Sequence, residues 1–211
     1  FTELTAELTA ELTAELTARK KQYEYYRDKL LSFDNLEGEI RYYMLSEVVD
    51  FKNGKGHEKE IDANGKFVVV NSKFISTNGN VKKFTNEQIC PVYIDDILMV
   101  MSDLPNGRAL AKCFLVDSNE TYSLNQRICS LTKKQGFDIN NKYLFYILNR
   151  NRQLLKFDNG VDQTNLKKED ILNIQIPVPS INLQEKIVYV LDNFDAICAD
   201  LNIGLPAEIN A

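Results

Sequence analysis

The feature that most constrains this chain is a tetrapeptide repeat at its start, FTELTAELTAELTAELTARKK. A leucine recurs at every fourth position, at Leu4, Leu8, Leu12 and Leu16. The alanines and glutamates between them are strong helix formers. Four helical residues rise about 6 Å and turn by about 400°, so each leucine lies about 40° around the helix from the previous one. After the repeat, apolar residues take the three- and four-residue steps of a coiled coil, at Tyr23, Tyr26, Leu30 and Phe33. The pattern predicts a helix over residues 2–31, ended by DNLEGE.

Residues 40–125 instead alternate short apolar runs with glycine-bearing turns. FVVVNSKFI, CPVYI and DILMVM are rich in β-branched and aromatic residues and predict strands, whereas KNGKG, DANGK, STNGN and DLPNGR predict turns or loops. NNKYLFYILNRNRQLLKF predicts a helix. A short helix over residues 167–172 and the strand IQIPVP are expected to follow.

A second amphipathic helix is predicted after Pro179. Asn182 and Glu185 have the spacing of a capping box, and apolar residues then step by four, three, four and three before Gly204 and Pro206 end the helix. The predicted fold class is α+β, a β-rich domain flanked by two long amphipathic helices. The expected domains are a helix over 1–36, a β-rich domain over 37–180, and a helix with tail over 181–211. The helices could pack on each other, on a second copy or on another protein.

The net charge of −5 is unevenly distributed along the chain. Residues 51–85 carry seven lysines against three acids, and residues 127–156 carry seven lysines and arginines against Asp138, which leaves −15 for the rest. Local basic surface, not total charge, attracts phosphates, although solvated loops explain these charges equally well. The four cysteines form no Cys-x-x-Cys pair and His57 is the only histidine, so we expect reduced thiols and no zinc site. Without a signal peptide or a membrane-length apolar run, the expected location is cytoplasmic.

Three stretches resemble the specificity subunit of type I restriction–modification systems. The tetrapeptide array with ARKKQYEYYRDKLLSF is similar to the spacer helix of that family, and MLSEVVDFKNGKG is similar to the beginning of a target recognition domain. GVDQTNLKKEDILNIQIPVPSINLQEKIVYVLDNFDAI is similar to the end of that domain and the second spacer helix. With YSLNQRI in the middle, the resemblance covers nearly the whole chain.

The resemblance implies a non-catalytic DNA-binding subunit whose two spacer helices pair antiparallel in a coiled-coil-like stalk. Family members usually carry two recognition domains, each for one half of a split target. Methyltransferase subunits, which use S-adenosylmethionine, dock on the helices, and motor–nuclease subunits join for cleavage. Any S-adenosylmethionine, ATP or Mg²⁺ would therefore sit on partner subunits, and this chain would hold no cofactor or metal. It has one recognition domain, so we expect either an excised half or a half-length subunit that pairs as a homodimer on a palindromic target.

Loops that combine Lys or Arg with Asn or Gln are the best candidates for DNA contact, because these side chains bind phosphates and base edges. The candidates are Lys52, Asn53, Lys55, Asn71, Ser72, Lys73, Asn78, Asn80, Lys82, Lys83, Arg108, Lys133, Lys134 and Gln135. Asn125, Gln126 and Arg127 are either contacts or structural anchors. Arg150 and Arg152 face phosphate or solvent. His57 is expected to be a loop residue. The expected helix–helix or partner contact comprises Leu4, Leu8, Leu12, Leu16, Tyr23, Tyr26, Leu30, Ile187, Leu191 and Phe194.

Two other classes of function compete with DNA recognition. A methyltransferase would need a cofactor-binding glycine motif and an Asn/Asp-Pro-Pro-aromatic motif, and the sequence has neither. A helical protein-interaction scaffold would bind no DNA, and a steep loss of DNA binding with salt would exclude it. If DNA recognition holds, the repeat acts as a ruler. One unit turns about 40°, close to the roughly 34–36° of one base pair.

Overall fold

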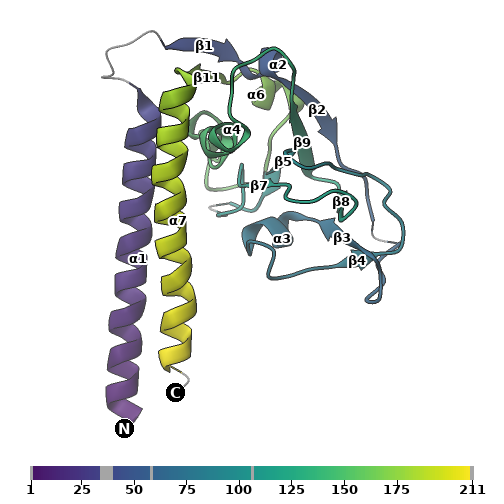
Figure 1. The fold of residues 1–211 in the computed structure, drawn as a ribbon. Helices are drawn as coiled ribbons and strands as arrows, with labels where there is room; N and C mark the ends of the chain where they lie inside the picture. The colour runs from purple at the N-terminus through teal and green to yellow at the C-terminus, as the bar shows by residue number, and fades with distance from the viewer. Residues whose placement is uncertain (1, 34–39, 58, 106, 210–211) are drawn as a thin grey trace. The chain divides into compact units, whose positions relative to one another are not determined.

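The computed structural model describes residues 2–33, 40–57, 59–105 and 107–209. The chain divides into two compact units, one formed by Phe1–Glu39 with Pro179–Ala211 and the other by Ile40–Val178. The first unit contains helices α1 (Thr2–Ser32) and α7 (Ile181–Ile209). These helices lie side by side, with the beginning of α1 and the end of α7 at the same end (Figure 1). The predicted helix over residues 2–31 is confirmed by α1, whereas the DNLEGE segment lies outside the described residues.

The two helices of the first unit meet through aromatic rings. Phe194 of α7 lies 6.3 Å from Tyr23 and 6.2 Å from Tyr26 of α1, measured between ring centroids, and Ile187 and Leu191 are buried. Leu30 is half-buried, as is Leu12, and the side chain of Leu16 is outside the described part. Leu4 and Leu8 remain 68% and 49% exposed in the single chain. The start of α1 therefore keeps apolar surface available to a further partner.

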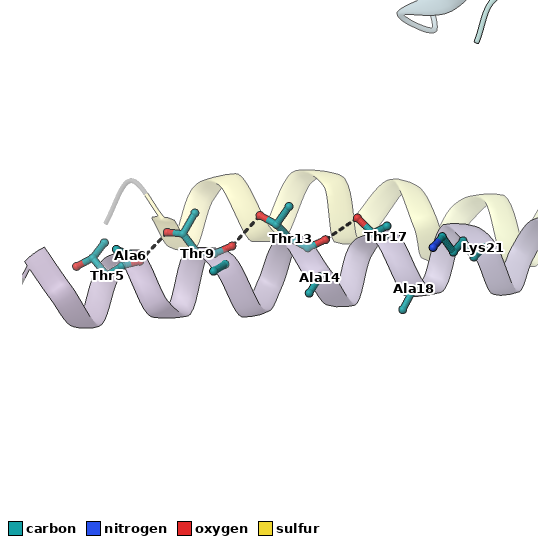
Figure 2. A pocket seen from close by; sticks show the side chains of 9 residues that line it. Thr5, Ala6, Thr9, Thr13, Ala14, Thr17, Ala18 and Lys21 are labelled. Atoms are coloured by element: carbon teal, nitrogen blue, oxygen red, sulfur yellow. Dashed lines mark hydrogen bonds between the residues drawn. The ribbon is translucent and has the colours of Figure 1, made fainter. Parts of the chain in front are cut away.

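Threonine hydroxyls follow one face of α1, and those of Thr9, Thr13 and Thr17 are satisfied within the helix. The Oγ1 atoms of Thr9, Thr13 and Thr17 donate to the carbonyl oxygens four residues earlier, at 2.6, 2.7 and 2.8 Å. Together with alanines 6, 10, 14 and 18 and with Lys21, the threonines line a shallow groove along the repeat (Figure 2). The repeat thus presents a uniform surface of small side chains, with no need for an outside hydrogen-bond partner at these hydroxyls.

The second unit combines helices and small sheets, so the mixed α and β fold class is confirmed. Its strands are β1 (Arg41–Met44), β2 (Val49–Asn53), β3 (Phe67–Val70), β4 (Phe84–Thr85), β5 (Ile97–Val100), β6 (Ser102–Asp103), β7 (Cys113–Leu115), β8 (Tyr122–Leu124), β9 (Ile128–Lys133), β10 (Thr164–Asn165) and β11 (Gln175–Val178). Its helices are α2 (Leu45–Val48), α3 (Ser72–Ser76), α4 (Asn141–Leu148), α5 (Arg152–Leu155) and α6 (Lys168–Leu172).

These strands form a four-stranded sheet in the order β2-β9-β5-β7, a three-stranded sheet β4-β3-β8, and the pairs β1-β11 and β10-β6. All pairs are antiparallel except β3 with β8. One apolar core connects the two larger sheets with α3. The rings of Phe74 and Tyr122 in this core meet the partly buried ring of Phe114 and each other edge to face, with centroids 5.0, 5.9 and 5.4 Å apart. The loops at the sheet ends are therefore anchored on a packed core.

One predicted strand is shorter than expected, and another is wrong. In FVVVNSKFI only Phe67–Val70 is a strand, because the Asn71 side chain accepts a hydrogen bond from the Phe74 amide at 2.9 Å and begins α3. CPVYI contributes only an isolated bridge between Pro91 and Ser123. Proline cannot donate to a ladder, and the Asp96 carboxylate holds the Tyr93 amide in a turn at 2.9 Å. The strand in DILMVM and the helix over 167–172 are confirmed as β5 and α6.

Three features of the predicted helices are also wrong: one helix is broken in two, and the last helix begins and ends elsewhere. The helix expected over NNKYLFYILNRNRQLLKF is broken into α4 and α5, because Asn149 accepts a hydrogen bond from the Cys113 amide at 3.0 Å and Arg150 takes a positive φ of 58°. The capping box at Asn182 does not form. Helix α7 already begins at Ile181, with the Ser180 carbonyl accepting from the Leu183 and Gln184 amides. Helix α7 also continues past Gly204 and Pro206 to Ile209.

Candidate nucleic-acid interface

The candidate interface lies at one end of the four-stranded sheet. The register brings the end of β2, the start of β9, the end of β5 and the start of β7 to the same side: Asn53 pairs with Cys129, Val100 with Ile128, and Met99 with Cys113. The loops that leave these strand ends therefore emerge next to one another, although they are far apart in the sequence.

Two of these loops, residues 53–57 and 124–128, are joined through their backbones. The Lys55 amide donates to the Leu124 carbonyl and the Gln126 amide donates to the Lys55 carbonyl, both at 3.0 Å. A Cβ atom on Gly54 would lie 1.9 Å from the Asn125 carbonyl oxygen, so this approach requires glycine. The side chains of Asn53, Lys55 and Gln126 are exposed while the backbones beneath them are fixed. This arrangement presents amide and ammonium groups on a rigid support.

Within the stretch Asn125–Arg127, Asn125 has the hydrogen bond of a structural anchor, whereas Gln126 and Arg127 have exposed side chains. The Asn125 side chain is half-buried and accepts a hydrogen bond from the Gln126 amide at 2.8 Å, as a structural anchor does. Arg127 adopts a positive φ of 66°, and its side chain is exposed. Gln126 and Arg127 therefore project from the turn that Asn125 stabilises.

Helix α3 adds a second group of candidates beside this turn. The Asn125 amide donates to the Val70 carbonyl at 3.1 Å, which places Asn71 next to the 125–127 turn. The Asn71 side-chain oxygen is occupied as the helix cap, Ser72 is half-buried and Lys73 is exposed. Beyond the helix, Asn80, Lys82 and Lys83 are exposed. Of these residues, Lys73, Asn80, Lys82 and Lys83 keep their charged or amide ends accessible.

Lys112, which the sequence reasoning missed, links α3 to the start of β7. Its Nζ atom donates to the Asn78 side-chain oxygen at 2.8 Å and to the Ser76 carbonyl at 3.0 Å. Asn78 itself has a positive φ of 50°. Lys112 lies in no polar loop motif, and only the pairing of β5 with β7 brings it to this end of the sheet, so the sequence carried no signal for it.

Arg108 is presented by a loop that one carboxylate stabilises. Asp103 accepts hydrogen bonds from the amides of Leu104, Ala109 and Leu110 at 2.9, 2.7 and 3.1 Å. Arg108 is exposed on this loop, which leads into β7. We call the exposed residues Asn53, Lys55, Arg108, Gln126 and Arg127 the basic edge, and Lys112, which is half-buried, holds α3 beside it. Its charged members are all cationic, and the nearby Asp103 is used by backbone amides.

Four predicted contacts have other surroundings. Lys133 and Lys134 lie at the opposite end of the β2–β9 ladder, where Val49 pairs with Lys133, and Gln135 follows them. Their Nζ atoms donate to the carbonyls of Ile139 and Ser46 at 2.6 and 2.8 Å. Lys52 donates to the Pro91 carbonyl at 2.6 Å. The structure therefore does not bring Lys133, Lys134 and Gln135 to the basic edge. Lys133 and Lys134 instead stabilise the fold of the second unit through these hydrogen bonds.

The pair β6–β10 places two further amides beside the large sheet. Gln163 donates through Nε2 to the Ser102 hydroxyl at 2.9 Å and to the Asn165 side-chain oxygen at 3.2 Å. The Leu166 amide donates to the Met101 carbonyl at 2.8 Å, which fixes this segment next to the end of β5. In the sequence these residues belong to GVDQTN, a stretch that carries the family resemblance, and neither Gln163 nor Asn165 was among the predicted contacts.

Cys113 and Cys129 are not reactive thiols near neutral pH. Cys90, Cys113 and Cys129 are free and buried, whereas the side chain of Cys198 is outside the described part. Burial raises the pKa of Cys129 to about 12 and, together with the charge of Cys129, raises the pKa of Cys113 well above its usual value. Both thiols stay protonated near neutral pH and cannot act as nucleophiles.

Within the described ranges, no helix is long and apolar enough to cross a membrane.

The structure thus combines a β-rich unit that carries the basic edge with a unit of two long helices. The family model for the type I restriction modification DNA specificity domain matches residues 38–211. The chain therefore belongs to this family of specificity subunits. Because these subunits are non-catalytic, the membership confirms that the chain is not itself an enzyme.

Relatives and solved structures agree with this assignment. The specificity subunit of the Escherichia coli restriction enzyme EcoR124I/EcoR124II is 30% identical over 99% of this chain and 52% of that protein. A putative type I specificity subunit of Mycoplasma pneumoniae, S.MpnORF285P, is 29% identical over 90% of this chain and 61% of that protein. The crystal structure of the HsdS subunit from Thermoanaerobacter tengcongensis shares the fold, with a TM-score of 0.63 at 16% identity over 98% of this chain and 51% of that one. The chain thus spans about half the length of these relatives.

Proposed function

We propose that this chain is a DNA-recognition module that binds one half of a bipartite target in a type I restriction–modification system. Its membership in the specificity family supports DNA recognition. The basic edge supports the location of the contact, because four sequence-distant strand ends there place exposed amides among cationic side chains. The arginine and lysine groups suit phosphates and guanine, and the amides of Asn53 and Gln126 suit adenine. Lys73, Asn80, Lys82 and Lys83 extend the phosphate contact along the duplex.

The two helices carry the proposed contacts with protein partners. We expect α1 and α7 to form an antiparallel stalk that spaces the recognition domain and docks methyltransferase subunits, with motor–nuclease subunits joining the assembly. The ring contacts of Phe194 with Tyr23 and Tyr26 support pairing of the helices. Exposed Leu4, Leu8 and Tyr25 supply apolar and aromatic surface of the kind that anchors partners. S-adenosylmethionine, ATP and Mg²⁺ would be bound by those partners and not by this chain, in the cytoplasm.

A second copy of the chain would complete the target. One recognition domain contacts one half-site, so two copies related by a twofold axis would bind a palindrome interrupted by a gap. The exposed leucines at the start of α1, Leu4 and Leu8, support such pairing, since burial of apolar side chains on association is favourable.

The test is selection of bound duplexes from a randomised library, with this chain mixed with a type I methyltransferase subunit. Recovery of a split palindrome with a fixed gap would establish the homodimer. Recovery of one asymmetric half-site would leave DNA recognition in place and remove the homodimer. A library without enrichment at low salt would contradict the proposed function.

The alternative is a helical protein-interaction scaffold without DNA recognition. The exposed apolar residues of α1 fit that function equally well. The two functions differ in their response to salt, because phosphate contacts release counterions and make log K fall steeply with log salt. Binding of duplexes that is independent of salt, or absent, would favour the scaffold.

A further inference from the structure

His57, the only histidine of the chain, lies fully buried beneath the basic edge. Its Nδ1 atom is 2.7 Å from the carbonyl oxygen of Lys55, and its Nε2 atom is 2.7 Å from the hydroxyl of Ser123. Ser123 is also fully buried, and its Oγ atom accepts a hydrogen bond from the Cys90 amide at 3.1 Å. The imidazole therefore bridges the loop after β2 and the strand β8, which are separated by 66 positions in sequence.

The partners determine which ring nitrogen carries the proton. A carbonyl oxygen can only accept, so Nδ1 carries the hydrogen and donates to Lys55. In the neutral ring Nε2 is then the acceptor, and the Ser123 hydroxyl donates to it while accepting from Cys90. Every polar atom of this buried chain of hydrogen bonds is thus satisfied, as a stable buried network requires.

The Lys55 carbonyl is the point where this network meets the candidate DNA contacts. It accepts two hydrogen bonds, one from His57 Nδ1 at 2.7 Å and one from the Gln126 amide at 3.0 Å. The first fixes the loop that carries Asn53 and Lys55, and the second fixes the turn that carries Gln126 and Arg127. A change in the position of this single carbonyl would move both groups of exposed side chains relative to each other.

We propose that His57 is a positioning residue for DNA recognition, which sets the spacing between the loop of Lys55 and the turn of Gln126 through its hydrogen bond to the Lys55 carbonyl. This inference rests on the proposed function. His57 touches no DNA itself, because it is buried. It affects the sequence specificity of DNA binding. The cationic side chains, which supply most of the non-specific affinity, stay in place.

Two substitutions separate the two hydrogen bonds of His57. In His57→Asn the side-chain nitrogen can occupy the position of Nδ1 and donate to Lys55, but the side chain no longer reaches Ser123. In His57→Gln the terminal amide occupies the position of Nε2 and serves Ser123, but the donor to Lys55 is lost. Each variant loses one buried hydrogen bond, so a purely structural role predicts similar behaviour for both.

The library selection with the methyltransferase subunit is repeated with both variants of the full chain. We expect His57→Asn to recover the wild-type sequence, and His57→Gln to enrich it about tenfold less, the discrimination typical of one base contact. The salt dependence of total duplex binding should match the wild type in both. Tyr143→Phe is the control, because it removes the buried hydrogen bond from Tyr143 to the Pro177 carbonyl, at 2.9 Å, at a site away from the basic edge.

The outcomes separate this inference from the proposed function. If the wild type enriches a sequence and His57→Gln enriches it equally well, His57 is not a positioning residue and only this inference fails. Equal losses in His57→Asn, His57→Gln and Tyr143→Phe would assign the effect to general destabilisation and would also overturn it. A wild type that enriches no sequence contradicts DNA recognition itself, and the inference fails with it.

Discussion

At the scale of single residues, Gly54 shows how a close approach of two backbone segments admits glycine and no larger residue. Its amide donates to the Ile128 carbonyl at 3.0 Å, and the next residue is paired with Leu124. The loop after β2 can approach the 125–127 turn this closely only without a Cβ atom, which would lie 1.9 Å from the Asn125 carbonyl oxygen. The KNGKG motif is therefore a packing requirement as much as a turn signal.

Replacing Gly54 by alanine should destabilise the chain by about 3 kcal/mol or more, because backbone must move to admit the methyl group. Gly136→Ala is the matched control. Its Cβ would meet nothing within 4 Å, and only its positive φ of 89° penalises alanine, by about 1 kcal/mol. Urea unfolding followed by circular dichroism measures both. Equal free energies of unfolding for the two variants would contradict the close approach at Gly54.

The buried thiols make stability depend on alkaline pH. Burial raises the pKa of Cys129 to about 12 from its usual 9.0. Between pH 9 and 12 the unfolded chain therefore loses this proton while the folded chain keeps it. The contribution of this thiol to the free energy of unfolding is fully present below pH 9. It is lost as the pH rises toward 12, at up to about 1.4 kcal/mol per pH unit. Cys129→Ala should show a shallower decline in the free energy of unfolding above pH 9, and an identical slope would contradict the prediction.

At the scale of elements, stretches with a regular apolar pattern were predictable, whereas elements whose bounds depend on one side-chain hydrogen bond were not. The heptad steps of α1 and the compact apolar run of β5 appear in the sequence as regular patterns, and both were predicted. SKFIS has strand-like composition, but one side-chain cap at Asn71 makes it helical. The break between α4 and α5 depends on Asn149, whose partner Cys113 is 36 residues away. Local propensity carries no information about such a partner.

The aromatic contacts between α1 and α7 give a prediction for the helical unit. Phe194→Ala removes the ring that meets both Tyr23 and Tyr26, at centroid distances of 6.3 and 6.2 Å. We expect a loss of about 2–4 kcal/mol, from burial and from ring pairing. Tyr189→Ala on the same helix is the control, because that side chain is 71% exposed and should cost less than about 0.5 kcal/mol. Thermal unfolding monitored at 222 nm would compare them, and similar midpoints would argue against the ring contacts.

At the scale of the whole molecule, the basic edge follows from strand register and not from any single loop. The sequence identified Lys55 and Arg108 as candidates, but Lys133 and Lys134 were predicted with them on equal grounds. Only the antiparallel pairing of β2 with β9 places the latter two at the opposite end of the ladder. Lys112 was not predicted, because only the pairing of β5 with β7 brings it to this end of the sheet. Composition identifies candidate loops, and topology decides which of them meet.

The repeat of α1 gives the last prediction, which rests on the proposed pairing of two copies. Deleting Thr9–Leu12 removes one unit, about 6 Å of helix and about 40° of rotation. That rotation matches about one base pair of B-DNA and that rise about two, so the gap between recovered half-sites should shorten by one or two base pairs. The half-site sequence should stay the same, because the recognition domain is untouched.

Library selection with the shortened chain measures this gap directly. A chain with Thr9→Ala and Thr13→Ala is the control. It loses the hydroxyl bonds to the carbonyls of Thr5 and Thr9, but keeps the number of repeats. Its gap should equal that of the wild type, because helix length and not threonine chemistry sets the spacing. An unchanged gap in the deletion variant would mean that α1 does not set the distance between half-sites. A changed gap in the threonine variant would mean that the groove surface does.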